Sequence, residues 1–185
     1  MIVWIFRLKY TSLLFTTLLL SLLPACRQET VAPAESGPQA SATERLQTFQ
    51  GAWFEVRYPA DFTVKPSLPS STAEGYDSVE FIAPDGTVTF YIFSPQWGGE
   101  AEDIALEPER EELVDEHVEK NDDRELRWFT IAAKDGSYRR SYQETVAQQG
   151  ALKTIFGIGY RDEVARKHYQ QQYLEFRESL EQFAD

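Results

Sequence analysis

Two histidines are the only imidazole groups in this sequence of 185 residues, and they limit the acid-base chemistry that the chain can offer. Catalysis by an activated nucleophile needs a hydroxyl or thiol beside a base that a third group orients. His117 lies in an acidic segment and His168 precedes a tyrosine near the C-terminus, and neither belongs to a recognisable catalytic motif. We therefore predict no catalytic residue and no cofactor, and interpret His168 as a packed or surface side chain.

The acidic segment from Glu107 to Asp123 is the part of the sequence most suited to binding a cation. On a helix, Glu112 would share a face with Glu116, and Asp115 would share a face with Glu119. Such carboxylate pairs are candidates for a hard cation or zinc, but neither a calcium-loop spacing nor a two-histidine zinc motif is present. We interpret the segment as a solvated acidic face in which any helix is exposed, and metal binding is the alternative.

A loop with a large aromatic side chain is the strongest candidate for contact with a partner or ligand. Residues 94–99 read SPQWGG, which places Trp97 among turn-forming residues directly after an expected strand. Tryptophan is enriched at the energetic centres of interfaces, and loops often carry binding residues. Trp97, Gly98 and Gly99 are the candidate contact residues, and the favoured alternative is that Trp97 caps one end of the sheet core.

Cys26 is the only cysteine, and it follows a leader typical of protein export. Arg7 and Lys9 precede an apolar run over residues 13–23 that is too short to span a bilayer. The run ends in LPAC at residues 23–26, which resembles the lipobox of bacterial lipoproteins. The resemblance implies that residues 1–25 are a signal peptide and that lipid on Cys26 anchors the protein in a membrane of the bacterial cell envelope, outside the cytoplasm.

The predicted lipidated cysteine begins a tether over residues 26–43. Residues 27–43 read RQETVAPAESGPQASAT, a composition without aromatic residues that buries too little surface to fold. Arg27 stands where the inner-membrane retention signals of enteric-type lipoproteins have Asp, so the outer membrane is favoured in a Gram-negative cell.

The charge of the predicted mature chain excludes one class of partner. Removing the leader removes two basic residues, Arg7 and Lys9, and no acidic residue, so the formal charge changes from −12 to −14. Such a chain repels nucleic acid and anionic lipid headgroups. The remaining length suits a single domain over residues 44–185, and an aromatic content of 14% is sufficient for its core.

Alternation of apolar and polar residues predicts an antiparallel sheet of about six strands. Two pairs of strands are joined by Asp-Gly turns, at Asp85-Gly86 and Asp135-Gly136, which is typical of hairpins. In the last strand, Gly157 and Gly159 leave room on one face for a packed helix or a close backbone. The predicted strands are residues 53–58, 79–83, 87–93, 126–133, 137–145 and 152–160.

Helical periodicity predicts one long C-terminal helix over residues 162–183. Apolar residues recur along one stripe, charged residues occupy the other side, and Asp162 is a suitable N-cap. A helix of this kind packs on a sheet, so the predicted fold class is α+β, an antiparallel sheet covered by helices.

The segment FEVRYPADF at residues 54–62, the hairpin around Asp85-Gly86 and a terminal helix with Phe176 and Leu180 together resemble PsbP-like domains. The resemblance covers residues 50–183 and implies an α/β/α sandwich. This fold occurs in photosystem II extrinsic proteins, in the Ran-binding Mog protein and in bacterial lipoproteins, where the domains resemble binding and assembly modules rather than enzymes.

We therefore expect a non-catalytic interaction or assembly factor that contacts an unidentified protein of the cell envelope. One alternative is a lipoprotein that binds a small ligand or metal. The least favoured alternative is an envelope hydrolase, because abundant carboxylates alone do not mark a catalytic pair.

Overall fold

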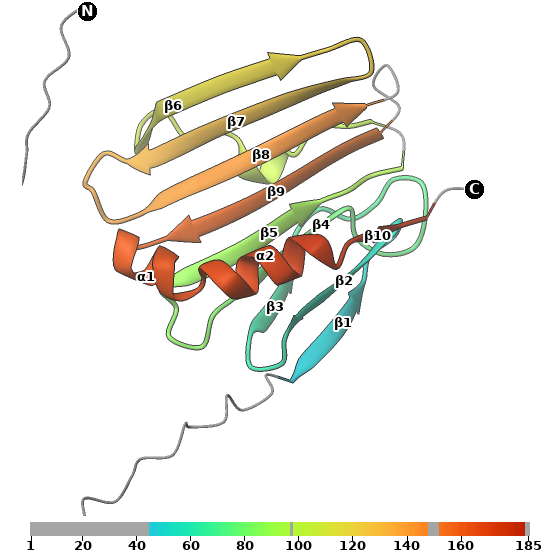
Figure 1. Cartoon of the computed structure of the whole chain (residues 1–185), viewed down its shortest axis with the longest axis horizontal. Coiled ribbons are helices and arrows are strands. Elements are labelled where there is room, and N and C mark those ends of the chain that lie inside the picture. Colours follow the sequence, from blue (N-terminus) through green and yellow to red (C-terminus); the bar gives the residue numbers. More distant parts are fainter. Residues whose placement is uncertain (1–44, 97, 148–151, 184–185) are drawn as a thin grey trace, which may run out of the picture. The chain divides into compact units, whose positions relative to one another are not determined.

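Ten β-strands in two antiparallel sheets dominate the computed structural model, which describes residues 45–96, 98–147 and 152–183 (Figure 1). The larger sheet has the order β3-β4-β5-β9-β8-β7-β6 and the smaller one the order β1-β2-β10. The larger sheet comprises β3 (Thr63–Pro66), β4 (Ser78–Ile82), β5 (Val88–Phe93), β6 (Glu111–Lys120), β7 (Arg124–Ala133), β8 (Arg139–Ala147) and β9 (Leu152–Tyr160); the smaller comprises β1 (Leu46–Gln50), β2 (Phe54–Pro59) and β10 (Glu181–Gln182).

Both predicted hairpins are confirmed, and the two turns are built alike. In the β4–β5 turn, Asp85 Oδ1 accepts hydrogen bonds from the backbone N–H and the hydroxyl of Thr87, at 2.9 and 2.8 Å. Asp135 Oδ1 accepts the same two bonds from Ser137, at 2.9 and 2.6 Å. The following glycines adopt φ of 67° and 74°, a conformation that costs other residues more. The Asp-Gly pairs therefore define the register of both hairpins.

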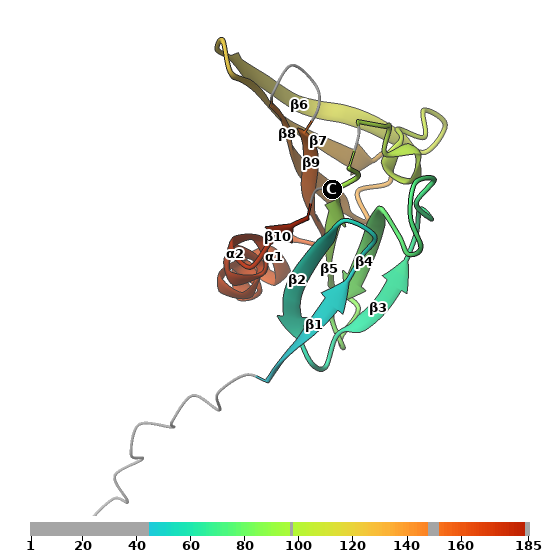
Figure 2. The same ribbon diagram turned by 90° about the vertical axis from the view of Figure 1, so that its right-hand side faces the viewer.

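The main core lies between the middle of the larger sheet and a layer formed by β2, α1 (Glu163–His168) and α2 (Gln170–Glu178) (Figure 2). Phe176 of α2 is 1% exposed, and its ring centroid lies 5.2 Å from that of Phe81 and 5.4 Å from that of Phe90. Burial of each such ring stabilises the fold by about 1.5–3 kcal/mol. Aromatic packing therefore holds the helices on the sheet.

A smaller core lies on the opposite face of the larger sheet. It combines Tyr91, Phe129 and Tyr142 with Ile104, which belongs to the 3₁₀ turn η1 (Glu102–Ile104). The loop that contains η1 covers this face, whereas α1 and α2 lie on the other face (Figure 2). The α+β class is confirmed, but the expected α/β/α sandwich is wrong for the described residues, because a loop replaces the second helical layer.

The single helix predicted over residues 162–183 is wrong in its extent. Asp162 caps α1 as predicted, since its Oδ1 accepts from Ala165 N–H at 2.8 Å. The helix breaks at Tyr169, whose ring is buried against Phe62 at 5.7 Å. Ser179 then ends α2, because its hydroxyl donates to Phe176 C=O and accepts from Arg57 N–H of β2. The chain continues as β10 because it pairs with β2.

The prediction of about six strands missed β1, β3, β6 and β10. Three of these are short, and β6 lies in the acidic segment that we interpreted in helical terms. Nine of the ten residues of β6 are exposed, so neither face needs the apolar alternation by which a strand is recognised. None of the described helices is long and apolar enough to cross a membrane.

Candidate functional site

Two of the residues predicted to have a site role, Cys26 and Trp97, lie outside the described residues. Gly98 and Gly99 are described, with φ of 55° and 119°. They line a polar pocket of about 400 Å³ together with Gln96 and Asp77. The structure therefore places the predicted glycines beside polar side chains at the end of β5.

Two residues that line this loop pocket each carry a buried polar atom without a hydrogen-bond partner among the described residues, Gln96 Nε2 and Asp77 Oδ1. Gln96 is 8% exposed, and burial raises the pKa of Asp77 even though a hydrogen bond with Ser70 opposes the shift. Buried polar groups are normally paired, so an amide donor and a carboxylate acceptor at one pocket are an observation in favour of a polar ligand.

The two histidines lie at different places on the surface. His117 of β6 is exposed, its Nε2 lies 3.1 Å from Glu119 Oε1, and its ring stacks on Trp128 of β7 at 5.5 Å. His168 is exposed at the end of α1 and contacts the ring of Tyr169 edge-on. The interpretation of His168 as a packed or surface residue is confirmed.

The acidic segment forms a strand rather than a helix, and this changes which carboxylates share a face. Along β6 successive side chains alternate between faces, so Asp115 and Glu119 lie on one face with His117, while Glu116 lies on the other. No group of three or more His, Cys, Asp or Glu residues capable of holding a metal occurs within residues 45–96, 98–147 and 152–183.

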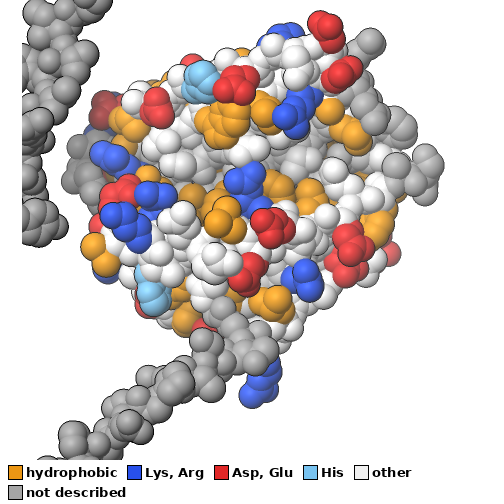
Figure 3. Space-filling view, viewed as in Figure 1, with side chains coloured by type: hydrophobic (Ala, Val, Ile, Leu, Met, Phe, Trp, Pro, Cys, Tyr) orange, Lys and Arg blue, Asp and Glu red, His pale blue; other side chains and the backbone are white. Residues whose placement is uncertain are grey.

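The flank formed by β6 and β7 lies at one edge of the larger sheet, and we take it as the candidate site because nine of the ten residues of β6 are exposed. On β6, Leu113, Val114 and Val118 are 43%, 44% and 48% exposed. On the face that carries α1 and α2, hydrophobic side chains lie beside a histidine over β6 and β7, away from the helices (Figure 3). Leu113 and Val118 belong to the opposite face, because they pair with Ile131 and Arg127 of β7, so apolar side chains are exposed on both faces of this edge. Exposed apolar side chains at the edge of a sheet mark a surface for protein contact.

A cleft on the opposite face of the sheet adjoins this flank. It has a volume of about 220 Å³ and reaches β6 at Leu113, while Phe129, Ile131 and Ile155 form its floor and Ile104 belongs to the covering loop. Small-molecule sites usually enclose about 300–1,000 Å³, so this cleft fits one or two side chains of a partner better than a larger ligand.

Charged residues from three strands form the rim of the cleft. Arg127 Nε lies 2.7 Å from Glu116 Oε1, and its guanidinium lies 4.4 Å above the ring of Phe129. Glu144 joins the two cations of the rim, because it lies 3.4 Å from Arg127 and 3.0 Å from Lys153. Both cations are therefore neutralised within the chain.

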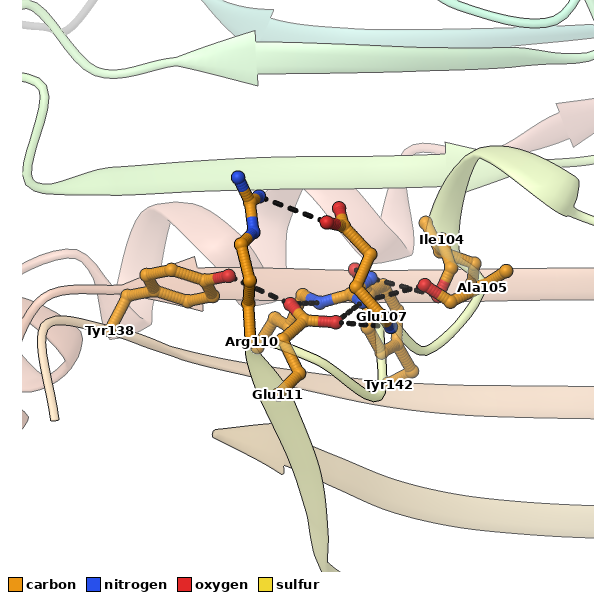
Figure 4. Close-up of polar contacts among 8 residues, drawn as sticks. Ile104, Ala105, Glu107, Arg110, Glu111, Tyr138 and Tyr142 are labelled. Atoms are coloured by element: carbon orange, nitrogen blue, oxygen red, sulfur yellow. Dashed lines mark hydrogen bonds and ion pairs between the residues drawn. The ribbon is translucent and has the colours of Figure 1, made fainter. Parts of the chain in front are cut away.

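A buried ion pair holds the start of β6 against the covering loop (Figure 4). Glu111 Oε1 accepts hydrogen bonds from Arg140 Nε at 2.9 Å and from the Tyr138 hydroxyl at 2.8 Å. Arg140 also donates to the carbonyl oxygens of Ile104 and Ala105, at 2.8 and 2.9 Å. The side chains of Arg140 and Glu111 are 14% and 2% exposed, so the pair is well shielded from water.

Electrostatics keeps this pair ionised. Burial opposes the charge on Glu111, but hydrogen bonds from Arg140, from Glu107 N–H and from Tyr138 outweigh it and lower the pKa of Glu111 to about 2. Hydrogen bonds to the charged form stabilise it. The pair therefore fixes the covering loop and the beginning of β6 at neutral pH.

The room that Gly157 leaves is filled by a side chain, not by a helix or a backbone as predicted. A Cβ at Gly157 would overlap the ring of Tyr142, and burial raises the pKa of that tyrosine to about 12. The sequence did not reveal the rim residues Arg127, Glu144 and Lys153. Their opposite charges lie on the same face of adjacent strands. This pattern can be recognised only when the register between the strands is known.

Comparison with known proteins gives likeness in structure only. No family model matches the chain, and no curated protein matches it. The chain is similar to the cyanobacterial PsbP protein CyanoP of Synechocystis sp. PCC 6803, with a TM-score of 0.46 and 11% identity over 78% of this chain and 96% of that one. It is also similar to the Ran-binding protein Mog1p of Saccharomyces cerevisiae, with a TM-score of 0.42 and 9% identity over 77% and 97% of the two chains.

A third similar structure is a protein of Bacteroides thetaiotaomicron, with a TM-score of 0.39 and 17% identity over 72% of this chain and 49% of that one. Each likeness concerns the course of the backbone and assigns no role to a residue of this chain.

Proposed function

We propose that this protein is a bacterial lipoprotein whose PsbP-like domain acts as a non-catalytic interaction or assembly factor at the cell envelope, held there by lipid on Cys26. The observation that carries the proposal is the exposed flank of β6 and β7, where Leu113, Val114 and Val118 face solvent on an edge strand. Apolar residues in such a place are expected where a partner covers them.

The sequence before the domain supports the anchoring part of the proposal. The LPAC sequence ends at Cys26, and residues 27–43 are rich in Pro, Ala, Ser, Gly and Glu. An extended linker reaches about 3.3 Å per residue, which allows the domain to contact a partner beyond the lipid headgroups. Lipid would thus restrict the search for a partner to the membrane surface.

The test is photo-crosslinking in cells from two exposed valines, one on the flank and one away from it. A photoreactive amino acid replaces Val118 of β6, which is 48% exposed, or Val164 of α1, which is 79% exposed. We expect one dominant crosslinked envelope protein from position 118 and none from the more exposed position 164. Equal patterns from the two positions, or no product from 118, would contradict the interaction function.

Anchoring is tested separately by metabolic labelling with an alkynyl fatty acid. The natural chain should take up the label and sediment with membranes, and the Cys26→Ala variant should do neither. Label that persists on the Cys26→Ala variant would show that the lipid is attached to another residue and would contradict anchoring through Cys26.

A second candidate function, binding of a small polar ligand, is favoured by the loop pocket with Asp77 and Gln96. A carboxylate oxygen that accepts and an amide that donates complement an amide group. Ligand-observed NMR with N-acetylated amino acid amides should detect binding that Asp77→Ala removes and that Glu74→Ala, an exposed site on the neighbouring loop, leaves intact. Binding that survives in Asp77→Ala would exclude this pocket.

A further inference from the structure

The two edges of the larger sheet differ in how they are protected from pairing with another strand. β3 has four residues, ends in Pro66 and carries Lys65, which pairs with Glu80 of the neighbouring strand at 2.9 Å. Short length, proline and lysine are the usual devices that keep an edge strand from adding a partner. β6 has ten residues without Pro or Gly. The β6 edge therefore lacks the short length and the proline of β3, and its one lysine, Lys120, lies at its end.

β6 also offers a regular template. A bulge between Leu113 and Asp115 interrupts its pairing with β7, and from Asp115 to Lys120 the register is continuous. Because each strand of an antiparallel ladder directs only half of its backbone groups to one neighbour, the other half of the groups in this run point away from β7. An added strand can pair with those N–H and C=O groups.

The edge is held in place before any partner arrives. Glu111 binds Arg140 and Tyr138 at the start of β6, and the strand pairs with β7 on both sides of the bulge, ending with Lys120 opposite Glu125. An element that is already ordered does not lose further backbone entropy on binding. The cost of ordering then falls mainly on the incoming segment.

Charge selects the partner. Four exposed carboxylates lie along β6, those of Glu112, Asp115, Glu116 and Glu119, against one lysine at its end. A second copy of β6 would bring carboxylates against carboxylates, and like charges on adjacent strands are destabilising. A segment with lysines and arginines would meet opposite charge along the same edge.

We propose that β6 is the docking edge for an extended, lysine- or arginine-rich segment of the partner protein, which adds to the larger sheet as a further strand beside Asp115 to Lys120. This inference rests on the proposed function and adds the chemistry of the partner. Exposed Val118 contributes apolar contact on one face of the added strand, and Asp115 and Glu119 contribute charge on the other.

The test uses the full chain in detergent and a ten-residue peptide of alternating lysine and valine as the probe. A second peptide of the same sequence is N-methylated at alternate residues, so it keeps the charge and loses backbone donors. We expect the first peptide to protect β6 amides from hydrogen exchange without protecting those of β3, and to bind about tenfold or more tightly than the N-methylated peptide.

A matched pair of variants separates this edge from the general acidity of the chain. Asp115→Asn/Glu119→Gln removes two charges from β6, and Glu175→Gln/Glu178→Gln removes two from exposed positions of α2. The first variant should weaken peptide binding roughly threefold or more, and the second should leave it near the natural value. Equal loss in both variants, or equal affinity for the N-methylated peptide, would overturn the docking edge.

The two proposals fail separately. An envelope protein that crosslinks at position 118, combined with a peptide that leaves β6 unprotected, would retain the interaction function and reject the basic added strand. Self-association of the chain through β6 would also reject the basic partner. Absence of any crosslinked protein at position 118 would instead reject the interaction function.

Discussion

β5 and β6 belong to the same sheet and have opposite surroundings. Val88, Phe90 and Ile92 of β5 are at most 1% exposed, and they face the helices across a core of aromatic rings. On β6 only Glu111 is buried, and the other nine residues are exposed. A strand in the middle of a sheet is therefore held by side-chain packing, whereas this edge strand is held by its ladder with β7 and by one buried ion pair.

Substitutions in these two strands are therefore expected to affect different properties of the domain. Substitution in β5 or against it removes apolar contacts and creates cavities, so it changes the free energy of unfolding. Substitution on β6 beyond Glu111 changes surface chemistry and leaves the core intact. A partner surface on β6 can thus vary without loss of the fold.

The largest expected effect on stability comes from removing a buried aromatic ring from the main core. Phe176→Ala removes a ring that contacts Phe81, Phe90 and Phe156, and we expect it to lower the free energy of unfolding by about 3–5 kcal/mol. Urea unfolding measures the loss. Val164→Ala in α1, at a position 79% exposed, is the control and should change stability little. A loss below that of the control would contradict the assignment of Phe176 to the core.

The next effect comes from removing the one buried attachment of β6. Glu111→Gln leaves the guanidinium of Arg140 buried without its counterion, and we expect a loss of about 2–3 kcal/mol in the free energy of unfolding. Glu112→Gln, at the exposed neighbouring position, is the matched control. Chemical denaturation that ranks the two variants equally would show that the ion pair does not hold the strand.

The same carboxylate predicts how stability depends on pH. Its pKa is about 2 in the folded chain against an ordinary value of 4.5, so the folded form binds fewer protons between these values. The stabilisation by Glu111 is therefore complete above about pH 4.5 and is lost as the pH falls towards 2, with a slope of up to about 1.4 kcal/mol per pH unit. Unfolding measured from pH 5 to 2 should show a shallower slope in Glu111→Gln. An unchanged slope would place the titrating group elsewhere.

The smallest expected effect compares one substitution in both strands. Val118→Thr on β6 should change the free energy of unfolding by less than about 0.5 kcal/mol, because the side chain is half exposed. Val88→Thr on β5 places a hydroxyl at a position 1% exposed and should cost about 1–3 kcal/mol. Thermal unfolding of the two variants checks the contrast. Equal losses of stability would mean that another part of the same chain covers Val118.

The strands that the sequence predicts are those with one face buried, such as β2, where Phe54, Val56 and Tyr58 alternate with polar residues. The sequence did not predict β6, because this strand buries neither of its faces and so shows no alternation of apolar and polar residues. The C-terminal helix was predicted too long because its apolar spacing continues past Ser179, while the hydrogen bonds of Ser179 with β2 end the helix. Tertiary contacts outweighed local periodicity there.

The alternating strands, the two Asp-Gly hairpins and the cap at Asp162 could be predicted from the sequence, because each depends on residues that are neighbours along the chain. Two features needed the folded structure: the acidic segment is an open edge strand, and Arg127, Glu144 and Lys153 meet at one cleft. The physical reason is that an edge and a cross-strand charge network are defined by which strands lie side by side and in what register, and that order arises from packing between distant segments.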